Sequence, residues 1–247
     1  MSVNTEFCDP FEGSQKDIWM KLEHCGRYLF ACDFIEKHNC RTVIDMASAN
    51  GYGSAMLAKC ASQIIAADRN VKYLQSKYLS NPQIQTLCID FDVEKLEDFL
   101  PRTDAVVCFE TIEHLRMPFR FLEQAGNCIS ENGWLLLSFP NSLYERFNED
   151  GSNKDPYHLQ VIKCEDVLAF LKNHGFVLHT VLGQCLCNEI CTIQHDLKDA
   201  GIIAGEDVNS AFCYDENSIR TLARLMAYPS ELRVGNSYSI IIVAKKV

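Results

Sequence analysis

Residues 43–57 read VIDMASANGYGSAML and carry the clearest structural signal in the chain. The apolar start of this segment indicates a buried strand, and its glycines indicate a turn that opens a helix. Such a corner of an open α/β sheet binds ligands, because glycines let the backbone approach closely and the helix N-terminus offers unpaired N–H groups. Gly51 and Gly53 fit this role, whereas Ala47 and Ala49 stand where glycine is expected. The segment predicts a working nucleotide-cofactor loop, and the alternatives are a decayed loop and a chance match.

Short apolar strands alternate with helices around this segment, which predicts a mostly parallel sheet covered on both faces. We expect strands at residues 42–46, 63–68, 84–90, 104–110, 134–139, 176–182 and 237–246, the last two as an antiparallel edge pair. We expect helices at residues 14–38, 54–60 and 71–79, in the stretch through Leu122 and Ile129, and at 164–176, with a turn at NGW (132–134). The prediction is a single α/β domain over residues 1–247, with the helix at 14–38 over the cofactor loop.

Two stretches fall outside this alternation. Residues 141–158 are polar and lack periodicity, so we expect an active-site loop over the carboxyl ends of the strands. Residues 183–218 are the least regular part and are expected to be an insertion. They contain potential zinc ligands, but paired CxxC motifs are missing and buried thiols are the simpler expectation. These candidates are Cys185, Cys187, Cys191 and His195.

Composition restricts the class of protein. Lys and Arg total 23 and Asp and Glu total 33, giving a net charge of −10, so the chain has no bulk attraction for a polyanion such as nucleic acid. No apolar run approaches the roughly 18 residues of a membrane span. The 13 cysteines are most simply read as reduced thiols, which predicts a cytoplasmic protein.

Three acidic residues end successive expected strands. Asp45 ends the first, Asp68 the second and Asp90 the third. An acid at the end of the second strand can accept hydrogen bonds from ribose hydroxyls. A carboxylate at the third can accept from an adenine amino group, with Phe91 packing on the ring. The alternative is that the three acids only cap helices or face solvent.

With these residues identified, the chain resembles the class I S-adenosylmethionine-dependent methyltransferases. Four segments carry the resemblance in the right order: VIDMASANGYGSAMLA, FETIEHL, ISENGWLLLSFPN and PYHLQVIKCEDVLAFLKNHGF. The helix segment EHCGRYLFA is similar to the helix that precedes the first motif in one subgroup of this family. Members of that subgroup often act on glycans or other small metabolites. The resemblance implies a Rossmann-like fold with a seven-stranded sheet and S-adenosylmethionine as cofactor.

The resemblance also implies residue roles. Asp45 and the loop from Ala47 to Gly53 would hold the methionine end of the cofactor. Arg27 would meet its carboxylate, and the alternative is a solvated arginine on the helix surface. Asp68 would hold the ribose, and Asp90 and Phe91 the adenine. Glu110, at the end of the fourth strand, is assigned to both the cofactor and a metal. If the Ala49 position needs a positive φ, alanine costs on the order of 1 kcal/mol there.

The motif FETIEHL indicates the chemistry. On a helical turn, Glu110, Glu113 and His114 would share one face, and His158 in the expected active-site loop would be a fourth ligand. Carboxylates and imidazoles suit a divalent cation, which can lower the pKa of an acceptor hydroxyl. The pattern is similar to that of small-RNA 3′-end 2′-O-methyltransferases and some quinone-pathway O-methyltransferases, where the cluster holds Mg²⁺.

Two alternatives stay open for these residues. Without metal, His114 or His158 would be the general base, with Glu113 orienting it. In a purely structural reading, Glu113 and His114 pair locally. The expected function is O-methylation of a hydroxyl of a sugar or other small metabolite. The alternatives are RNA 3′-end 2′-O-methylation and a non-catalytic cofactor-binding subunit, which Ala49 motivates.

Overall fold

The computed structural model describes residues 8–11, 18–70, 72–184, 200 and 215–247. Its seven strands form one sheet in the order β3-β2-β1-β4-β5-β7-β6. The first five strands run parallel, and β7 pairs antiparallel with β5 and β6. The predicted mostly parallel sheet with an antiparallel edge is therefore confirmed. The strands are β1 (Thr42–Met46), β2 (Gln63–Asp68), β3 (Ile84–Cys88), β4 (Thr103–Phe109), β5 (Ile129–Pro140), β6 (Phe176–Gln184) and β7 (Ser239–Lys246).

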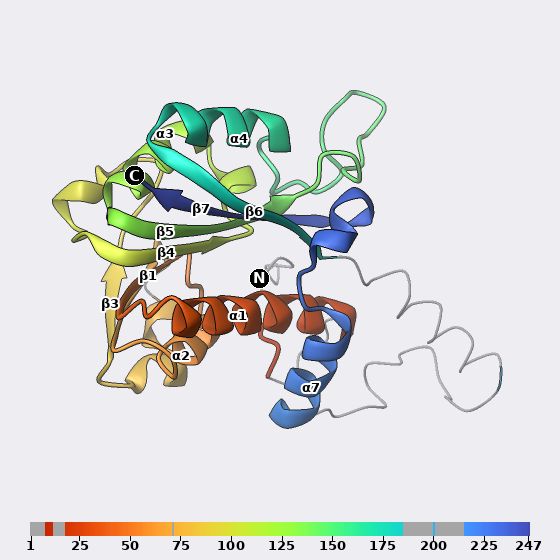
Figure 1. Ribbon diagram of the computed structural model, residues 1–247. Coiled ribbons are helices and arrows are strands. Elements are labelled where there is room, and N and C mark those ends of the chain that lie inside the picture. Colours follow the sequence, from red (N-terminus) through yellow and green to blue (C-terminus); the bar gives the residue numbers. More distant parts are fainter. Residues whose placement is uncertain (1–7, 12–17, 71, 185–199, 201–214) are drawn as a thin grey trace.

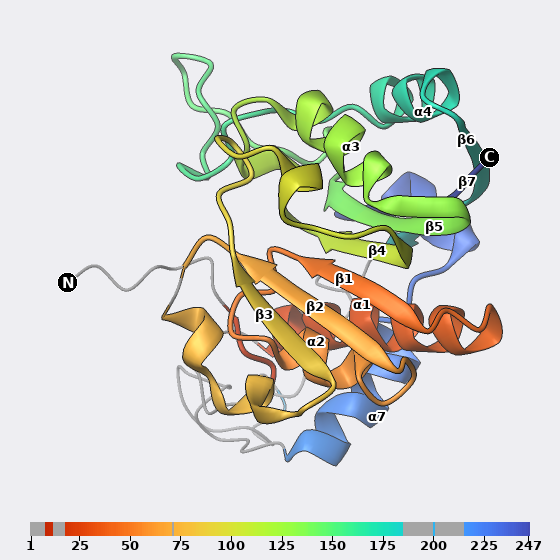
Figure 2. The same cartoon turned by 90° about the vertical axis from the view of Figure 1, so that its left-hand side faces the viewer.

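Helices cover both faces of the sheet, as Figures 1 and 2 show. One face carries α1 (Ile18–Lys37), α2 (Tyr52–Leu57) and α7 (Glu216–Met226), and the other carries α3 (Pro118–Asn127) and α4 (Cys164–Asn173). Each face has its own apolar core, because successive strand residues point to opposite sides. Val43 belongs to the core under α1, and Ile44 to the core under α3.

The strand order places the ligand-binding crevice. From β1 the chain moves outward to β2 and β3, then returns to β4 on the other side of β1. Ligands of open α/β sheets bind outside the carboxyl ends of the strands at such a reversal. The segments that follow β1 and β4, residues 47–51 and 110–114, therefore lie side by side at this point.

Several predicted boundaries were wrong. The helix expected at 71–79 is two short 3₁₀ turns, Tyr73–Gln75 and Lys77–Ser80, because Ser76 is extended (ψ 155°) and its hydroxyl caps the second turn. The turn expected at residues 132–134 lies inside β5, where Asn132 has a φ of 65°. Helix α2 occupies residues 52–57 instead of 54–60.

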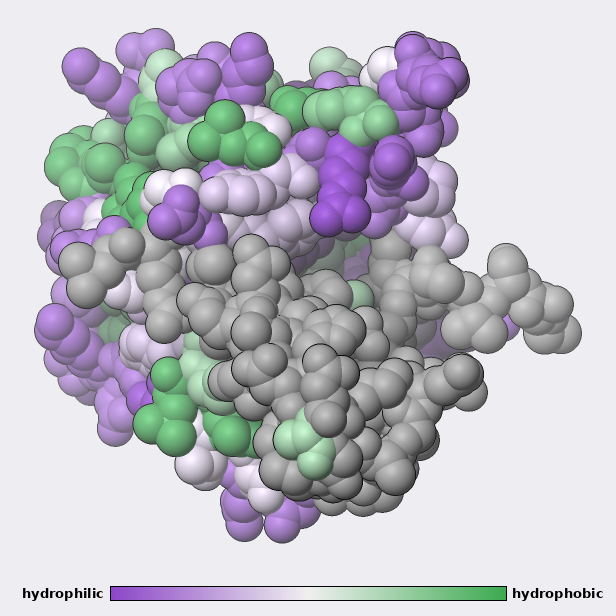
Figure 3. Space-filling view, turned by 90° about the vertical axis from the view of Figure 1, so that its right-hand side faces the viewer, coloured by the Kyte–Doolittle hydropathy of each residue, from purple (hydrophilic) through white to green (hydrophobic). Residues whose placement is uncertain are grey.

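Other predictions depend on which residues are described. Most of the stretch 183–218, with its potential zinc ligands, lies outside them, as do residues 14–17 of the first expected helix. Among the helices of the described residues, none is long and apolar enough to cross a membrane. The face shown in Figure 3 carries separate hydrophobic and hydrophilic patches.

Candidate active site

The loop after β1 has a left-handed backbone at both alanines. Ala47 has a φ of 58° and Ala49 a φ of 48°, and Gly51 follows at 80°. The backbone N–H of Ser48 donates to the carbonyl of Ala67 at 3.1 Å, which fixes the loop to the end of β2. An L-residue in this conformation costs about 1 kcal/mol. The loop therefore keeps the turn geometry of a glycine loop at the expense of strain.

The two remaining glycines are required by side chains of the protein itself. A Cβ atom on Gly53 would lie 2.0 Å from Cζ of Tyr28, and one on Gly51 would lie 2.2 Å from Cδ2 of Leu79. Such distances are far inside van der Waals contact. Gly53 thus makes room for the Tyr28 ring, which stands over the start of α2.

Asp45 is buried at the end of β1 and is held by two hydroxyl donors. The hydroxyl of Tyr28 donates to Oδ1 at 2.9 Å, and that of Ser54 donates to Oδ2 at 2.6 Å. Burial raises the pKa of Asp45 to about 7, although both hydrogen bonds oppose the shift. A nearby cation would therefore be needed to keep this carboxylate fully charged at neutral pH.

The structure brings the three strand-end acids to one edge of the sheet. Asp68 accepts from the backbone N–H of Ala49 at 2.9 Å and of Asn70 at 2.7 Å, and burial raises its pKa. Asp90 accepts from the N–H of Asp92 at 3.0 Å. Asp68 thus also ties the β1 loop to β2, a role for which its position in the sequence gave no signal.

Phe91 packs inward. Its ring centroid lies 5.3 Å from that of Phe121, and its side chain belongs to the core between the sheet and α3. Little of its side chain remains available to a ligand, since the residue is 8% exposed.

Arg27 is buried beside the end of β4. Its Nη1 donates to Oε1 of Gln184 at 2.9 Å and to the hydroxyl of Ser239 at 3.5 Å. Burial works to lower the pKa of Arg27, but the negative charges of Glu110 and Glu23 outweigh it and raise the pKa. Arg27 is therefore a permanent buried cation next to the crevice.

Glu110 does not share a face with Glu113 and His114, contrary to the sequence prediction. Its φ of 46° places it outside the 3₁₀ turn Ile112–His114. Its carboxylate accepts from the hydroxyls of Ser138 at 2.6 Å and Ser239 at 3.3 Å. Glu110 thus points to the ends of β5 and β7 and supplies a counter-charge for Arg27.

Glu113 is the most unusual group of the site. It is 1% exposed, and neither carboxylate oxygen has a hydrogen-bond partner among the described residues. Burial, and then the charge of Glu110, raise the pKa of Glu113 well above its ordinary value. Its backbone carbonyl accepts from the N–H groups of Leu159 at 2.8 Å and Gln160 at 3.0 Å, which ties this turn to the chain just after residues 141–158.

Two histidines meet Glu113. Its Oε1 lies 3.6 Å from Nε2 of His114, and the ring centroids of His114 and His158 are 5.1 Å apart. Donor atoms of Glu113, His114 and His158 lie within 4.8 Å of one another, a spacing that a metal ion can bridge. The structure thus brings together three of the four predicted ligands, and Glu110 is not among them.

Both imidazoles are oriented through Nδ1. In His114 it lies 3.0 Å from the carbonyl of Tyr157, which can only accept, so this nitrogen carries the proton. In His158 it lies 3.1 Å from Oε1 of Glu145. Burial lowers the pKa of His114, whereas the bond to Glu145 outweighs burial and raises that of His158. Sequence reasoning missed Glu145, whose only signal was its place in the expected active-site loop.

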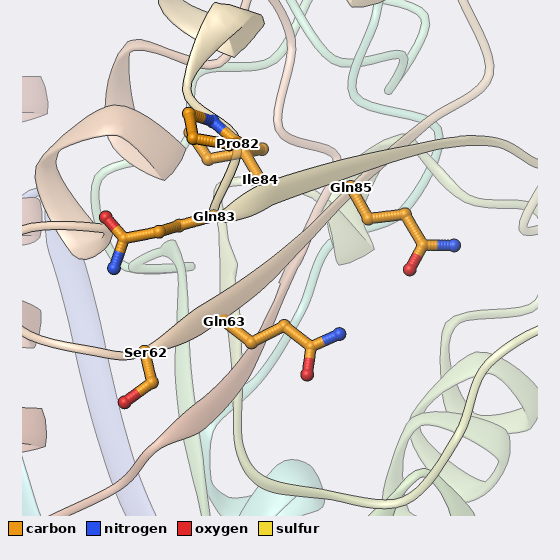
Figure 4. Close-up of a pocket in the computed structure, with 6 residues that line it drawn as sticks. All are labelled: Ser62, Gln63, Pro82, Gln83, Ile84 and Gln85. Carbon is orange, nitrogen blue, oxygen red and sulfur yellow. The ribbon is translucent and has the colours of Figure 1, made fainter.

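A surface hollow of about 530 Å³ lies away from these groups. Figure 4 shows its lining at the amino ends of β2 and β3, from residues 62–63 and 82–85. Asp68 and Asp90 lie at or just beyond the opposite ends of these two strands, so this hollow is separate from the candidate site.

Comparisons with known proteins identify the family of the chain. A methyltransferase domain profile matches residues 24–239. A Mycobacterium tuberculosis protein named probable S-adenosylmethionine-dependent methyltransferase is 28% identical over 140 residues, covering 56% of this chain and 49% of that protein. The ubiquinone biosynthesis O-methyltransferase of Histophilus somni is 22% identical over 182 residues, covering 70% of this chain and 76% of that protein.

The fold is similar to solved structures as well. The magnesium protoporphyrin IX methyltransferase from Synechocystis PCC 6803, solved with bound S-adenosylhomocysteine, superposes with a TM-score of 0.56 at 13% identity, covering 93% of this chain and 86% of that one. The chain spans about half the length of the mycobacterial relatives it matches. Because the profile covers most of the chain, the protein belongs to the methyltransferase domain family.

Proposed function

We propose that the protein binds S-adenosylmethionine and transfers its methyl group to a hydroxyl of a sugar or other small metabolite. The observation that carries the proposal is the buried Glu113 carboxylate, which has no hydrogen-bond partner among the described residues and faces two histidines at the reversal point of a methyltransferase fold. The name of the mycobacterial relative and the S-adenosylhomocysteine in the Synechocystis structure support the cofactor. The name of the Histophilus relative supports oxygen as the methylated atom.

The methionine end of the cofactor would lie against the β1 loop. Within the described residues Arg27 bonds through Nη1 alone, so Nε and Nη2 keep their donors for the cofactor carboxylate. The cofactor's ammonium group would stabilise the ionised form of Asp45, whose pKa burial has raised. Ala47, Ala49 and the two glycines would line the same end of the site.

The nucleoside end would meet the next two strands. Each oxygen of Asp68 accepts one backbone N–H, which leaves each a further lone pair for a ribose hydroxyl. Asp90 would accept from the adenine amino group, with Phe91 beside the ring. Glu110 would act at the methionine end through its effect on Arg27.

Glu113, His114 and His158 would hold a divalent cation such as Mg²⁺. The residues fit such an ion, because an ionised carboxylate buried without hydrogen bonds is costly unless a positive charge pairs with it. A bound cation would lower the pKa of the acceptor hydroxyl and stabilise the alkoxide. Glu145 fixes the ring of His158, and the carbonyl of Tyr157 fixes that of His114, as partners of metal ligands commonly do.

A second reading of the same residues needs no metal. Burial lowers the pKa of His114, which keeps the imidazole neutral and able to accept a proton at neutral pH. Burial raises the pKa of Glu113, which favours its uncharged form. The methyl donor is already activated, so the protein must only align the acceptor, exclude water and remove one proton.

The test begins with a calorimetric titration of S-adenosylhomocysteine into chelator-treated protein. We expect micromolar binding; no binding at high micromolar ligand would contradict an autonomous enzyme and favour the non-catalytic subunit. Binding of Mn²⁺ is then followed by electron paramagnetic resonance in the wild type, in Glu113→Gln and in the exposed control Glu149→Gln. Loss of Mn²⁺ binding in Glu113→Gln alone supports the metal site, and unchanged binding in both supports the metal-free reading.

Acceptor screening follows with and without Mg²⁺. Tyr157 and Leu159 are exposed on either side of His158, so we include hydroxylated acceptors with an apolar part. A cytoplasmic location remains part of the proposal, on the ground of the free cysteines in the described residues.

A further inference from the structure

We propose that Gln184 is a positioning residue that sets the orientation of Arg27 for the carboxylate of the cofactor. The inference rests on the proposed function, since it concerns the methionine end of the same site. Gln184 is the last residue of β6 and is 0% exposed. It lies 157 residues from Arg27 in the sequence.

Every polar group of the Gln184 amide has a partner. Oε1 accepts from Nη1 of Arg27 at 2.9 Å. Nε2 donates to the carbonyl of Glu23 at 3.0 Å and to that of Ala227. An amide is the uncharged side chain that offers an acceptor together with two donors, so glutamine matches this set of partners without adding charge. The amide therefore has a single orientation, with its oxygen toward Arg27.

This bond decides which edge of the guanidinium is left for a ligand. With Nη1 committed to Gln184 and Ser239, the donors of Nε and Nη2 form one planar edge. Such an edge binds a carboxylate through two parallel hydrogen bonds. Without Gln184 the guanidinium could turn toward Glu110, the half-buried carboxylate that most strongly raises its pKa. Gln184 thus prevents the ligand-binding edge of Arg27 from forming an internal ion pair with Glu110.

The end of α7 belongs to the same unit. A Cβ atom on Gly26 would lie 2.4 Å from the carbonyl oxygen of Ala227 and 3.0 Å from Nε2 of Gln184. Glycine at this position lets Ala227, the residue after α7, reach the amide beside Arg27. The packing of α7 on α1 is thereby linked to the orientation of Arg27.

The test compares two ligands on the wild type and on Gln184→Met. S-adenosylhomocysteine carries the carboxylate, and 5′-methylthioadenosine has the same nucleoside without the amino-acid end. We expect Gln184→Met to weaken binding of S-adenosylhomocysteine about tenfold, because a charge-assisted bond is misaligned. Binding of 5′-methylthioadenosine should change by less than about twofold. An equal loss for both ligands would overturn the inference, because it would show a general structural defect.

Two controls sharpen the comparison. Thr103→Val removes a buried polar group elsewhere, the hydroxyl that bonds to the carbonyls of Ala105 and Cys128 at the amino end of β4. It should leave the ratio of the two affinities unchanged. Gln184→Met in an Arg27→Met background should cause no further loss of S-adenosylhomocysteine affinity, whereas an additive loss contradicts action through Arg27.

The remaining outcomes are also decisive. If Gln184→Met does not fold, Gln184→Glu keeps the oxygen that faces Arg27, and it should retain the wild-type ratio of affinities despite lower stability. A ratio that falls tenfold in Gln184→Glu would overturn the inference. Wild-type protein that binds neither ligand contradicts the proposed function itself, and the inference then falls with it.

Discussion

At the scale of the residue, Ala47 and Ala49 show that a glycine loop can keep its path without its glycines. The path is imposed from outside, because Ser48 bonds to the end of β2 and Ala49 donates to the carboxylate of Asp68. These contacts hold each alanine at a positive φ. The strain of the two positive φ angles therefore lowers the stability of the fold and leaves the path of the loop unchanged.

Ala49→Gly should raise the free energy of unfolding by about 1 kcal/mol, because glycine has no Cβ to clash at a φ of 48°. Urea denaturation measures the change. The matched control is Ala55→Gly, which lies inside α2 and should lower stability by a similar amount, since glycine is unfavourable in a helix. If both variants lose stability alike, the strain at Ala49 has been misjudged.

Asp45 should make the stability of the ligand-free protein fall as the pH rises. Its pKa is raised from 3.8 to about 7 by burial, so its contribution is complete below about pH 4 and is lost up to pH 7. The unfolding free energy should decrease by at most about 4 kcal/mol over this window relative to Asp45→Asn. Urea denaturation at several pH values tests this difference.

Asp104 provides a control of opposite sign. Burial would raise its pKa, but the backbone N–H groups of Thr42 and Arg41 outweigh it and lower the pKa. The wild type should therefore gain stability over Asp104→Asn as the pH rises through the acidic range. A wild-type curve parallel to that of Asp45→Asn across pH 4–7 would refute a raised pKa at Asp45.

At the scale of the element, α1 and α2 meet where Tyr28 stands over Gly53. The Tyr28 ring packs edge-on against Tyr52 and Phe109, each with a centroid distance of 5.3 Å. Its hydroxyl reaches Asp45. Tyr52, Phe109 and Asp45 therefore fix the position of the Tyr28 ring. The ring fits against α2 only because residue 53 has no side chain.

Gly53→Ala should lower the free energy of unfolding by about 1–3 kcal/mol, because the new methyl group would displace the Tyr28 ring. It should also weaken S-adenosylhomocysteine binding, since the Tyr28 hydroxyl would leave Asp45. Thermal unfolding and calorimetry measure the two effects. Gly235→Ala is the control, because its Cβ would meet no atom within 4 Å. A stable Gly53→Ala protein would mean that the ring has room to shift.

The elements that the sequence predicted well are those defined by local patterns. Apolar runs identified the strands, and acids at their ends marked the edge at which Asp45, Asp68 and Asp90 meet. Local patterns predicted the wrong structure where the backbone conformation of a single residue ended a helix or turn. Extended Ser76 divides the expected helix, and left-handed Glu110 leaves the turn of Glu113.

The candidate site was only partly predictable for a related reason. Glu113, His114 and His158 belong to short motifs, and the motif types point to ligation. Glu145 and Gln184 take their roles from partners that the fold brings to them, 13 residues away for Glu145 and 157 for Gln184. No spacing or period in the sequence encodes those contacts.

At the scale of the whole molecule, charge separates the proposed acceptor from RNA. The sequence carries a net charge of −10. A polyanion would have to approach this surface without long-range attraction. A small neutral metabolite meets no such barrier, so the acidic balance favours it.

We therefore expect a short single-stranded RNA with a free 3′ end to bind more weakly than about 100 µM at near-physiological salt. Fluorescence anisotropy measures this affinity, and a parallel S-adenosylhomocysteine titration shows that the protein is competent. Lowering the salt concentration should strengthen RNA binding only slightly, because few phosphates would be neutralised and few counterions released. Submicromolar binding with a steep salt dependence would instead favour 2′-O-methylation of RNA ends, and local basic side chains would then have to outweigh the charge of the whole chain.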